Sequence, residues 1–246
     1  MTDSRDRYTA RDHAFRERDP YAAAKYWLTL RWLRPRMRPG ELLYNVGVGS
    51  GWFNHLAVAH GLRVEGCEPD ADAFTAAQRS APRGCTLEHG GLESFARGRP
   101  PAPLLVMHDV LEHIEDDRRA AATVSDLVAP GGVAVISVPA LMCLFGRHDE
   151  ELGHFRRYTP SSLRAVMEPY FTFERLRWFG AASIPIAWYF SRFRRAPYPT
   201  GAVGSPLGRA YAAVCAAESF IPEPIGTSLI ALLRPRAPAT KTSFRL

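Results

Sequence analysis

The stretch Leu42-Leu-Tyr-Asn-Val-Gly-Val-Gly-Ser-Gly51 decides the fold. An apolar run leads into three glycines, and the amphipathic run 52–60 follows at once, which is the pattern of a strand that turns sharply into a helix. Glycine lets the backbone turn tightly and lets a ligand approach the helix N-terminus, where unpaired N–H groups point outward. The stretch therefore predicts a ligand site at a strand-to-helix turn.

Strands and helices continue to alternate on both sides of this turn. We expect strands at 41–46, 63–68, 85–88, 104–108 and 133–138, and helices at 52–60, 71–80 and 116–129, the last closed by the turn Pro130-Gly-Gly132. Short connections between such elements imply right-handed crossovers and a parallel sheet that is covered on both faces. The pattern predicts a doubly wound α/β fold.

The flanking segments define the domain organisation. Residues 1–39 read as a charged N-terminal arm and a lid-like helix at 21–37, and residues 40–246 as one domain with an aromatic and basic insertion at about 181–205. After a loop at 140–159 we expect a helix at 160–167, a strand at 171–179, a helix at 206–220 and a strand at 228–233. Two strands so close to the C-terminus could form an antiparallel edge.

Composition excludes several classes of protein. The 246 residues are 46% hydrophobic and 23% charged, as in a folded globular protein, and the net charge of +6 is spread along the chain without a compact basic patch or an RNA-binding module. The four cysteines lie far apart, the N-terminus lacks the apolar core of a signal peptide, and the longest apolar stretches are only about ten residues long. These features favour a cytoplasmic protein that does not bind nucleic acid.

The residue at the end of the second strand points to a nucleoside. Glu68 follows Gly51 by 17 residues, where a carboxylate can accept hydrogen bonds from both hydroxyls of a ribose. Nicotinamide enzymes usually space their glycines as Gly-x-Gly-x-x-Gly, whereas this chain has Gly-x-Gly-x-Gly. The spacing favours S-adenosylmethionine over a nicotinamide cofactor, and an ordinary strand-to-helix turn is the structural alternative.

Two further motifs carry a family resemblance. With His108-Asp-Val-Leu-Glu-His-Ile114 and the Pro-Gly-Gly turn at 130–132, the chain resembles class I S-adenosylmethionine-dependent methyltransferases of the ubiquinone-biosynthesis-like branch over about residues 40–180. The resemblance implies a Rossmann-like, doubly wound seven-stranded sheet, mostly parallel with an antiparallel C-terminal strand and helices on both faces. It also implies S-adenosylmethionine bound across the carboxyl ends of strands one, two and four.

The resemblance implies roles for particular residues on the cofactor side. The expected cofactor-binding residues are Asn45, Gly47, Gly49, Gly51, Glu68, Leu92, Met107 and His108. Asn45 departs from the family, whose members usually carry Asp or Glu there, and an amide supplies no full negative charge to offset the ammonium and sulfonium groups of the cofactor. This departure motivates an alternative function, an adenosylmethionine-binding protein that does not methylate.

Candidates for the acceptor side follow the fourth and fifth strands. A general base helps when the acceptor is a hydroxyl or a neutral amine, and His113 and His154 are the candidate bases. His113 could instead buttress the next helix. In the run 148–159, which also resembles the family, Tyr158 could orient the acceptor, while Arg156 or Arg157 could clamp its carboxylate or phosphate.

Purely structural roles for residues of the run 148–159 also stay open. An Arg157–Asp149 ion pair could pin the loop, while His154 caps the helix that begins at residue 160. We expect no metal, because His148, Asp149 and His154 match no recognised ligand spacing.

Aromatic residues suggest contacts beyond the cofactor. Trp27 and its neighbours on the leading helix could close over an apolar acceptor or simply pack in the core. The stretch 184–195 combines aromatic residues with three arginines and could touch a membrane, a lipid-like substrate or a second copy in a homodimer. The favoured function is a methyltransferase acting on a small-molecule acceptor, apolar, lipid-linked or a secondary metabolite, and the least favoured is a nicotinamide oxidoreductase.

Overall fold

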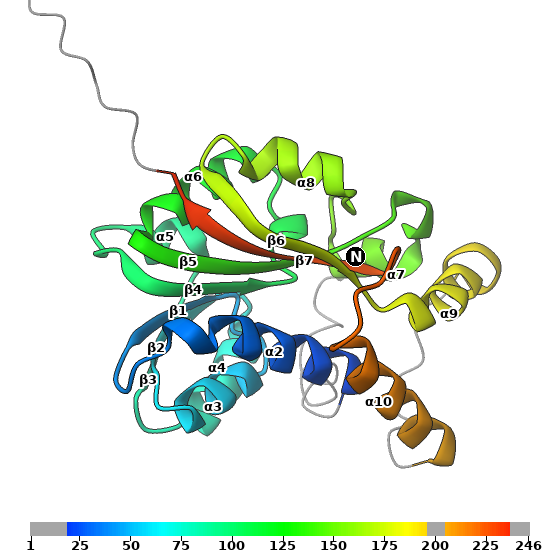
Figure 1. Ribbon diagram of the computed structural model, residues 1–246, viewed down its shortest axis with the longest axis horizontal. Helices are drawn as coiled ribbons and strands as arrows, with labels where there is room; N and C mark the ends of the chain where they lie inside the picture. The colour runs from blue at the N-terminus through cyan, green and yellow to red at the C-terminus, as the bar shows by residue number, and fades with distance from the viewer. Residues whose placement is uncertain (1–18, 196–204, 237–246) are drawn as a thin grey trace, which may run out of the picture.

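A seven-stranded sheet forms the centre of the computed structural model, which describes residues 19–195 and 205–236 (Figure 1). Its strand order is β3-β2-β1-β4-β5-β7-β6, and only β7 runs opposite to the other strands. The strands are β1 Leu42–Val46, β2 Arg63–Glu68, β3 Cys85–His89, β4 Ala102–His108, β5 Val128–Pro139, β6 Phe171–Phe179 and β7 Ser228–Pro235. The predicted doubly wound sheet with an antiparallel C-terminal strand is confirmed.

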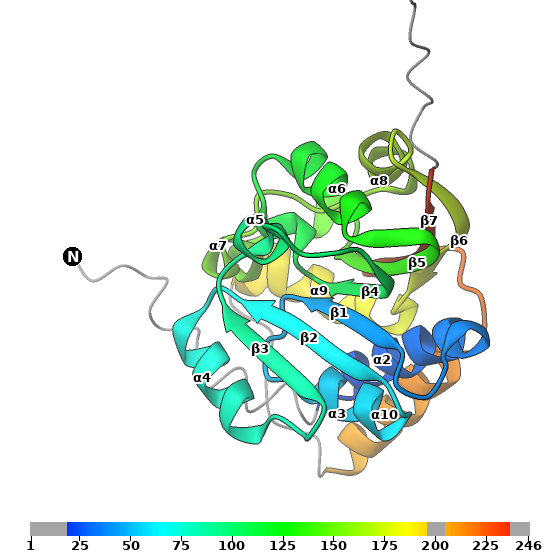
Figure 2. The same cartoon turned by 90° about the vertical axis from the view of Figure 1, so that its left-hand side faces the viewer.

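Helices cover both faces of the sheet, as Figure 1 shows. One face packs against α5 Leu92–Ala96, α6 Asp117–Asp126 and α8 Pro160–Met167, and the other against α2 Pro20–Leu33, α3 Trp52–Ala59 and α10 Pro206–Glu218. Alternation along β1 explains the two cores, since Tyr44 and Val46 join the first and Leu43 joins the second. Helix α4 Ala71–Ser80 lies beside β2 and β3 (Figure 2).

Backbone chemistry shifts some predicted boundaries. The leading helix ends at Leu33 and not at residue 37, because Pro35 has no N–H with which to continue it, and the short 3₁₀ helix η2 Arg34–Arg36 follows. The predicted turn at 130–132 lies inside β5, where the register against β4 shifts. A Cβ atom at Gly132 would lie 2.6 Å from the Pro103 carbonyl oxygen, so glycine allows this close strand approach.

Two segments without a predicted element contain helices. The loop 140–159 holds the 3₁₀ helix η4 Met142–Leu144 and α7 Arg147–Leu152. The insertion holds the 3₁₀ helix η5 Ala181–Ser183, α9 Ile184–Tyr189 and the short π-helix η6 Phe190–Arg194.

The arm at 1–18, the tail from 237 and the insertion between 196 and 204 lie outside the described residues. In the described part of the chain, no helix combines the length and the apolar character needed to cross a membrane.

Candidate functional site

The glycine-rich turn closes the carboxyl end of β1. Gly47, Gly49 and Gly51 have φ angles of +76°, +56° and +83°, which favour glycine, and Gly51 is the N-cap of α3. The Gly47 N–H donates to the carbonyl oxygen of Cys67 in β2 at 2.9 Å. A Cβ atom at Gly47 would lie 2.2 Å from Cγ2 of Val110, so the segment after β4 packs directly on the turn.

Glu68 is tied to this turn through its carboxylate. The side chain is buried at the end of β2, where Oε2 accepts from the Gly49 N–H at 2.7 Å and Oε1 accepts from the Asp70 N–H at 3.0 Å. Each carboxylate oxygen has more than one lone pair, so both can also accept hydrogen bonds from ribose hydroxyls. The predicted ribose-binding residue therefore lies beside the predicted cofactor turn.

Asn45 pairs with an amide from the neighbouring helix. Its side chain points toward α3, and Nδ2 donates to Oδ1 of Asn54 at 2.7 Å. Both side chains are buried, and within the described residues neither Asn45 Oδ1 nor Asn54 Nδ2 has a hydrogen-bond partner. The pair is neutral, so Asn45 supplies one acceptor oxygen but no charge, whereas the Glu68 carboxylate binds directly to the turn.

Helix α2 contributes a cation that sequence reasoning missed. The Lys25 side chain is 4% exposed and forms an ion pair with Oδ2 of Asp109, whose Oδ1 accepts from the Ser137 hydroxyl at 3.0 Å. Asp109 has a φ angle of +53° directly after β4. The sequence does contain a signal for this pair, because Lys25 is a lone lysine on the apolar face of α2, one turn before Leu28 and Thr29.

The two residues at the end of β4 point to opposite faces of the sheet. Met107 is fully buried in the core under α5 and α6, whereas His108 faces α2. Nε2 of His108 shares a hydrogen bond of 2.9 Å with the Thr29 hydroxyl, and the rings of Tyr26 and Phe53 both lie 5.0 Å from its ring. Burial, and then the Lys25 cation, lower the pKa of His108 to about 3, so the imidazole is neutral.

Loop contacts bring two candidate bases together at the carboxyl ends of β4 and β5. The Phe155 N–H donates to the Glu112 carbonyl oxygen at 2.8 Å, which draws the loop after β5 onto η3 Leu111–His113. Nε2 of His154 then lies 3.9 Å from Oε1 of Glu112, and the rings of His154 and His113 are 4.5 Å apart. We call Glu112, His113 and His154 the histidine cluster.

Asp149 fixes the orientation of His154. Its buried carboxylate contacts Nδ1 of His154 at 2.8 Å and accepts two hydrogen bonds from Arg157 at 2.8 and 3.0 Å. Burial raises the pKa of Asp149, but the hydrogen bonds from His154 and Arg157 outweigh it and lower that pKa overall. An ionised Asp149 can only accept hydrogen bonds, so Nδ1 of His154 donates to it and the Nε2 side of the ring faces Glu112 and His113.

The histidine cluster also has the composition of a metal site. One ligand atom from each of its three residues lies within 4.8 Å of the others, and nitrogen with carboxylate oxygen suits zinc and similar ions. This set differs from the one that the sequence analysis considered, which was His148, Asp149 and His154. Asp149 binds Arg157, and His148 is not part of the cluster. The sequence-based expectation of no metal stays a prediction.

Three other predicted residues are held by the protein itself. Arg156 pairs with Asp117 at 2.8 Å, and the Tyr158 hydroxyl donates to the same carboxylate at 3.0 Å from a fully buried ring. Arg157 forms the ion pair with Asp149 that the sequence analysis gave as its structural role. The helix that begins at residue 160 is capped by Thr159, whose hydroxyl accepts from the Ser162 N–H, so His154 does not cap it.

The two remaining candidates, Trp27 and Leu92, lie on α2 and α5, and their predicted roles stay predictions. Trp27 is 50% exposed on α2 and meets His60, which follows the end of α3 away from the glycine turn. Leu92 begins α5 and is buried in the core.

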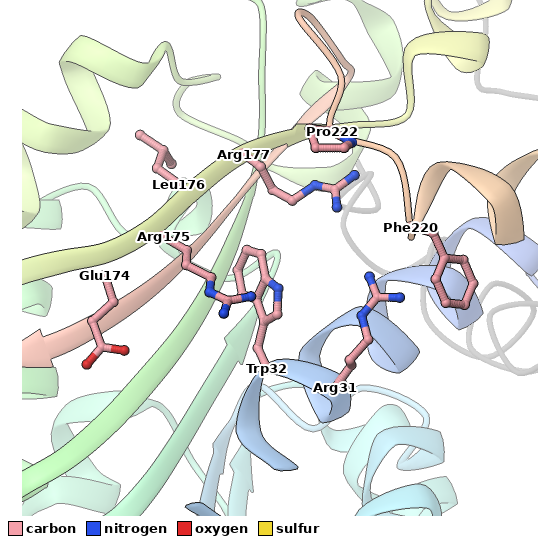
Figure 3. Close-up of a pocket in the computed structure, with 8 residues that line it drawn as sticks. All are labelled: Arg31, Trp32, Glu174, Arg175, Leu176, Arg177, Phe220 and Pro222. Carbon is pink, nitrogen blue, oxygen red and sulfur yellow. The ribbon is translucent and has the colours of Figure 1, made fainter. Parts of the chain in front are cut away.

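A separate hollow lies along the edge strand β6, where Figure 3 shows arginine side chains directed into it. Arg31 and Arg177 donate to the Ser219 carbonyl oxygen, and Arg177 also donates to those of Glu218 and Ile221. The carbonyl groups of Glu218 and Ser219 are acceptors at the C-terminal end of α10, and Ile221 lies in the turn that follows. The arginines therefore cap a helix, away from the carboxyl ends of β1, β2 and β4.

Sequence relatives of this chain are methyltransferases. A family model for a methyltransferase domain matches residues 15–179. An uncharacterized methyltransferase of Mycobacterium ulcerans (strain Agy99) is 29% identical over 124 residues, or 47% of this chain and 46% of that protein. A similar protein of Mycolicibacterium gilvum (strain PYR-GCK) is 30% identical over 119 residues, or 45% and 44%. The chain spans about half the length of the curated relatives it matches.

Solved structures show the same fold at low identity. A SAM-dependent methyltransferase from Archaeoglobus fulgidus has a TM-score of 0.61 at 14% identity, over 92% of this chain and 100% of that one. The cyclopropane synthase MmaA2 from Mycobacterium tuberculosis has a TM-score of 0.60 at 17% identity, over 87% and 84%. With the family match over residues 15–179, the glycine turn and Glu68, the chain belongs to the class I S-adenosylmethionine-dependent methyltransferases.

Proposed function

We propose that this protein transfers the methyl group of S-adenosylmethionine to a small-molecule acceptor, with His154 as the general base. The observation that carries the proposal is the position of His154, oriented by Asp149 and held beside the segment that packs on the glycine turn. Apolar and lipid-linked acceptors are favoured because exposed aromatic side chains, Trp188 among them, lie on a segment that contacts the loop leading into α7, the helix that carries Asp149. The ubiquinone-biosynthesis-like branch is the finer family assignment that we propose.

Each part of the site has a distinct task in this proposal. Bound S-adenosylmethionine would supply an electrophilic methyl group to an acceptor oxygen, nitrogen or carbon. Glu68 would hold the ribose, and Gly47 to Gly51 would let the backbone approach the ligand. His154 takes the acceptor's proton on Nε2, while Asp149 stabilises the imidazolium through Nδ1.

Cofactor binding is tested at Glu68. We expect Glu68→Ala to weaken the binding of S-adenosylhomocysteine about 100-fold or more in calorimetry, because two hydrogen bonds to a charged acceptor are lost. Glu41→Ala is the control, since its carboxylate precedes β1 at the opposite end of the sheet. Equal affinity of the Glu68 variant and the wild type would remove Glu68 from the ribose site.

The base is tested at His154. We expect His154→Ala to lower turnover about 100-fold or more, with the affinity for S-adenosylhomocysteine nearly unchanged. His55→Ala, an exposed histidine of α3, is the matched control. The assay is release of S-adenosylhomocysteine with a panel of phenol, amine and enol acceptors, each offered free and in detergent micelles. Full turnover in the His154 variant would exclude it as the base.

The same measurements separate the alternatives. Tight binding of S-adenosylmethionine without turnover on any acceptor in the panel would favour the non-methylating binding protein that Asn45 suggests. Tight binding of NADH without binding of S-adenosylmethionine would favour the oxidoreductase instead.

A further inference from the structure

The helical stretch from α9 through η6 to Arg195 carries large apolar side chains on its outer surface. Ile186, Trp188, Tyr189 and Phe193 are 47% to 64% exposed, whereas Ala187 is buried on the inner side. Contiguous exposed aromatic residues are uncommon on a globular protein and mark interaction surfaces. We call residues 184–195 the aromatic–arginine segment.

The exposed rings of this segment pack on one another. The Trp188 and Phe193 rings meet edge to face with centroids 5.0 Å apart, and the Tyr189 ring stacks on Phe193 at 6.1 Å. They therefore present one continuous apolar cluster to the surroundings and not isolated side chains.

The charges of the segment all have one sign. Arg192, Arg194 and Arg195 are exposed, and residues 184–195 contain no Asp or Glu. None of the three takes part in the ion pairs of the described residues. Tryptophan and tyrosine prefer the headgroup level of a bilayer, and arginine binds lipid phosphates, so the cluster is complementary to an anionic lipid surface.

The segment is anchored on the loop that leads into α7. The Ser191 hydroxyl donates to the Leu144 carbonyl oxygen at 2.7 Å, and a Cβ atom at Gly146 would lie 3.0 Å from Ser191. Gly146 is the N-cap of α7, which carries Asp149. In Figure 1, α9 lies next to α7 at one end of the molecule.

We propose that the aromatic–arginine segment docks the protein on anionic membrane surfaces, with Trp188 and Phe193 in the headgroup region and the arginines on lipid phosphates. The proposed binding is interfacial, because the exposed rings and arginines lie along one short helical stretch. Docking in this orientation would hold α7 and His154 near lipid-linked acceptors, a consequence that rests on the proposed function, whereas docking itself does not.

The test is binding of the full-length protein to vesicles in the absence of any acceptor. We expect sedimentation with vesicles of equal phosphatidylglycerol and phosphatidylcholine at 50 mM salt, and at least tenfold weaker binding to pure phosphatidylcholine. The variants Trp188→Ser with Phe193→Ser, and Arg192→Glu with Arg194→Glu, should each lower the partition coefficient at least tenfold.

Two control variants test whether any loss of binding is specific to the aromatic–arginine segment. Phe220→Ser removes an aromatic residue that is 72% exposed elsewhere, and Arg63→Glu with Arg79→Glu reverses two exposed charges on other elements. Both controls should bind like the wild type, and thermal melts should show that every variant is folded. Absent binding by the wild type, or equal losses in the controls, would overturn the proposal. So would a dimer that dissociates in the Trp188 and Phe193 variant without any vesicle binding.

Discussion

His108 should make the stability of the protein sensitive to acid. Its imidazole faces the Lys25 and Asp109 charges and two aromatic rings, and burial with the Lys25 cation lowers its pKa to about 3. The unfolded chain has the ordinary value of about 6.5 and therefore binds a proton earlier as the pH falls. This group's contribution to stability is complete above about pH 6.5 and is lost progressively between that pH and about 3.

The magnitude follows from the difference in pKa. A pH of 5 lies about 1.5 units below the pKa of the unfolded imidazole, which is therefore protonated, whereas the folded imidazole remains neutral. This difference in bound protons lowers the free energy of unfolding by about 2 kcal/mol relative to pH 7.5. His108→Gln cannot titrate but can still bond to Thr29. Between pH 7.5 and pH 5, the unfolding free energy of this variant should therefore fall by about 2 kcal/mol less than that of the wild type.

Urea unfolding at pH 7.5, 6 and 5 measures this difference. Other titrating groups are common to both proteins and cancel, and His55→Gln, an exposed histidine, should follow the wild type. Parallel curves for His108→Gln and the wild type would refute the reasoning, because a histidine with an ordinary pKa in the folded state gives no difference.

Three further predictions concern the turn, the loop and metal dependence. Gly47→Ala should weaken S-adenosylmethionine binding at least tenfold in calorimetry, because its Cβ would collide with Val110, whereas Gly98→Ala, with a similar φ of +70° and open space, should bind normally. Asp149→Asn should lower the free energy of unfolding by about 3–5 kcal/mol, since the buried Arg157 guanidinium loses its charged partner; a change below about 1 kcal/mol in urea titrations would contradict this. Turnover should survive dialysis against EDTA, and loss of activity that zinc restores would assign the histidine cluster to a metal instead.

The fold could be predicted because its signals are local and repeated. The apolar strands, the glycine turn and the spacing to Glu68 all lie within the chain from 41 to 138, and each agrees with a parallel sheet. The bulge at 130–132 was mistaken for a turn because Pro-Gly-Gly has the same local signature in both settings. Only the pairing of β5 with β4 distinguishes the two.

The site could be predicted only in part, because tertiary contacts decide which side chains meet. His154 and His113 are 41 residues apart, and their approach depends on a backbone bond between Phe155 and Glu112. No periodicity encodes that bond. Arg157 is a good candidate for anion binding by residue type, yet its actual partner Asp149 lies eight residues earlier on a helix that the loop pattern did not predict.

Asp149 receives the Gly146 N–H, the His154 ring and the Arg157 guanidinium on a single carboxylate. The fold of the loop and the orientation of the His154 ring are therefore coupled through this one side chain. An engineer who shortens this loop to change the acceptor would also disturb the ring that we propose as the base. Variants selected for a new substrate should accordingly lose turnover when the contacts of Asp149 are broken, even when His154 itself is retained.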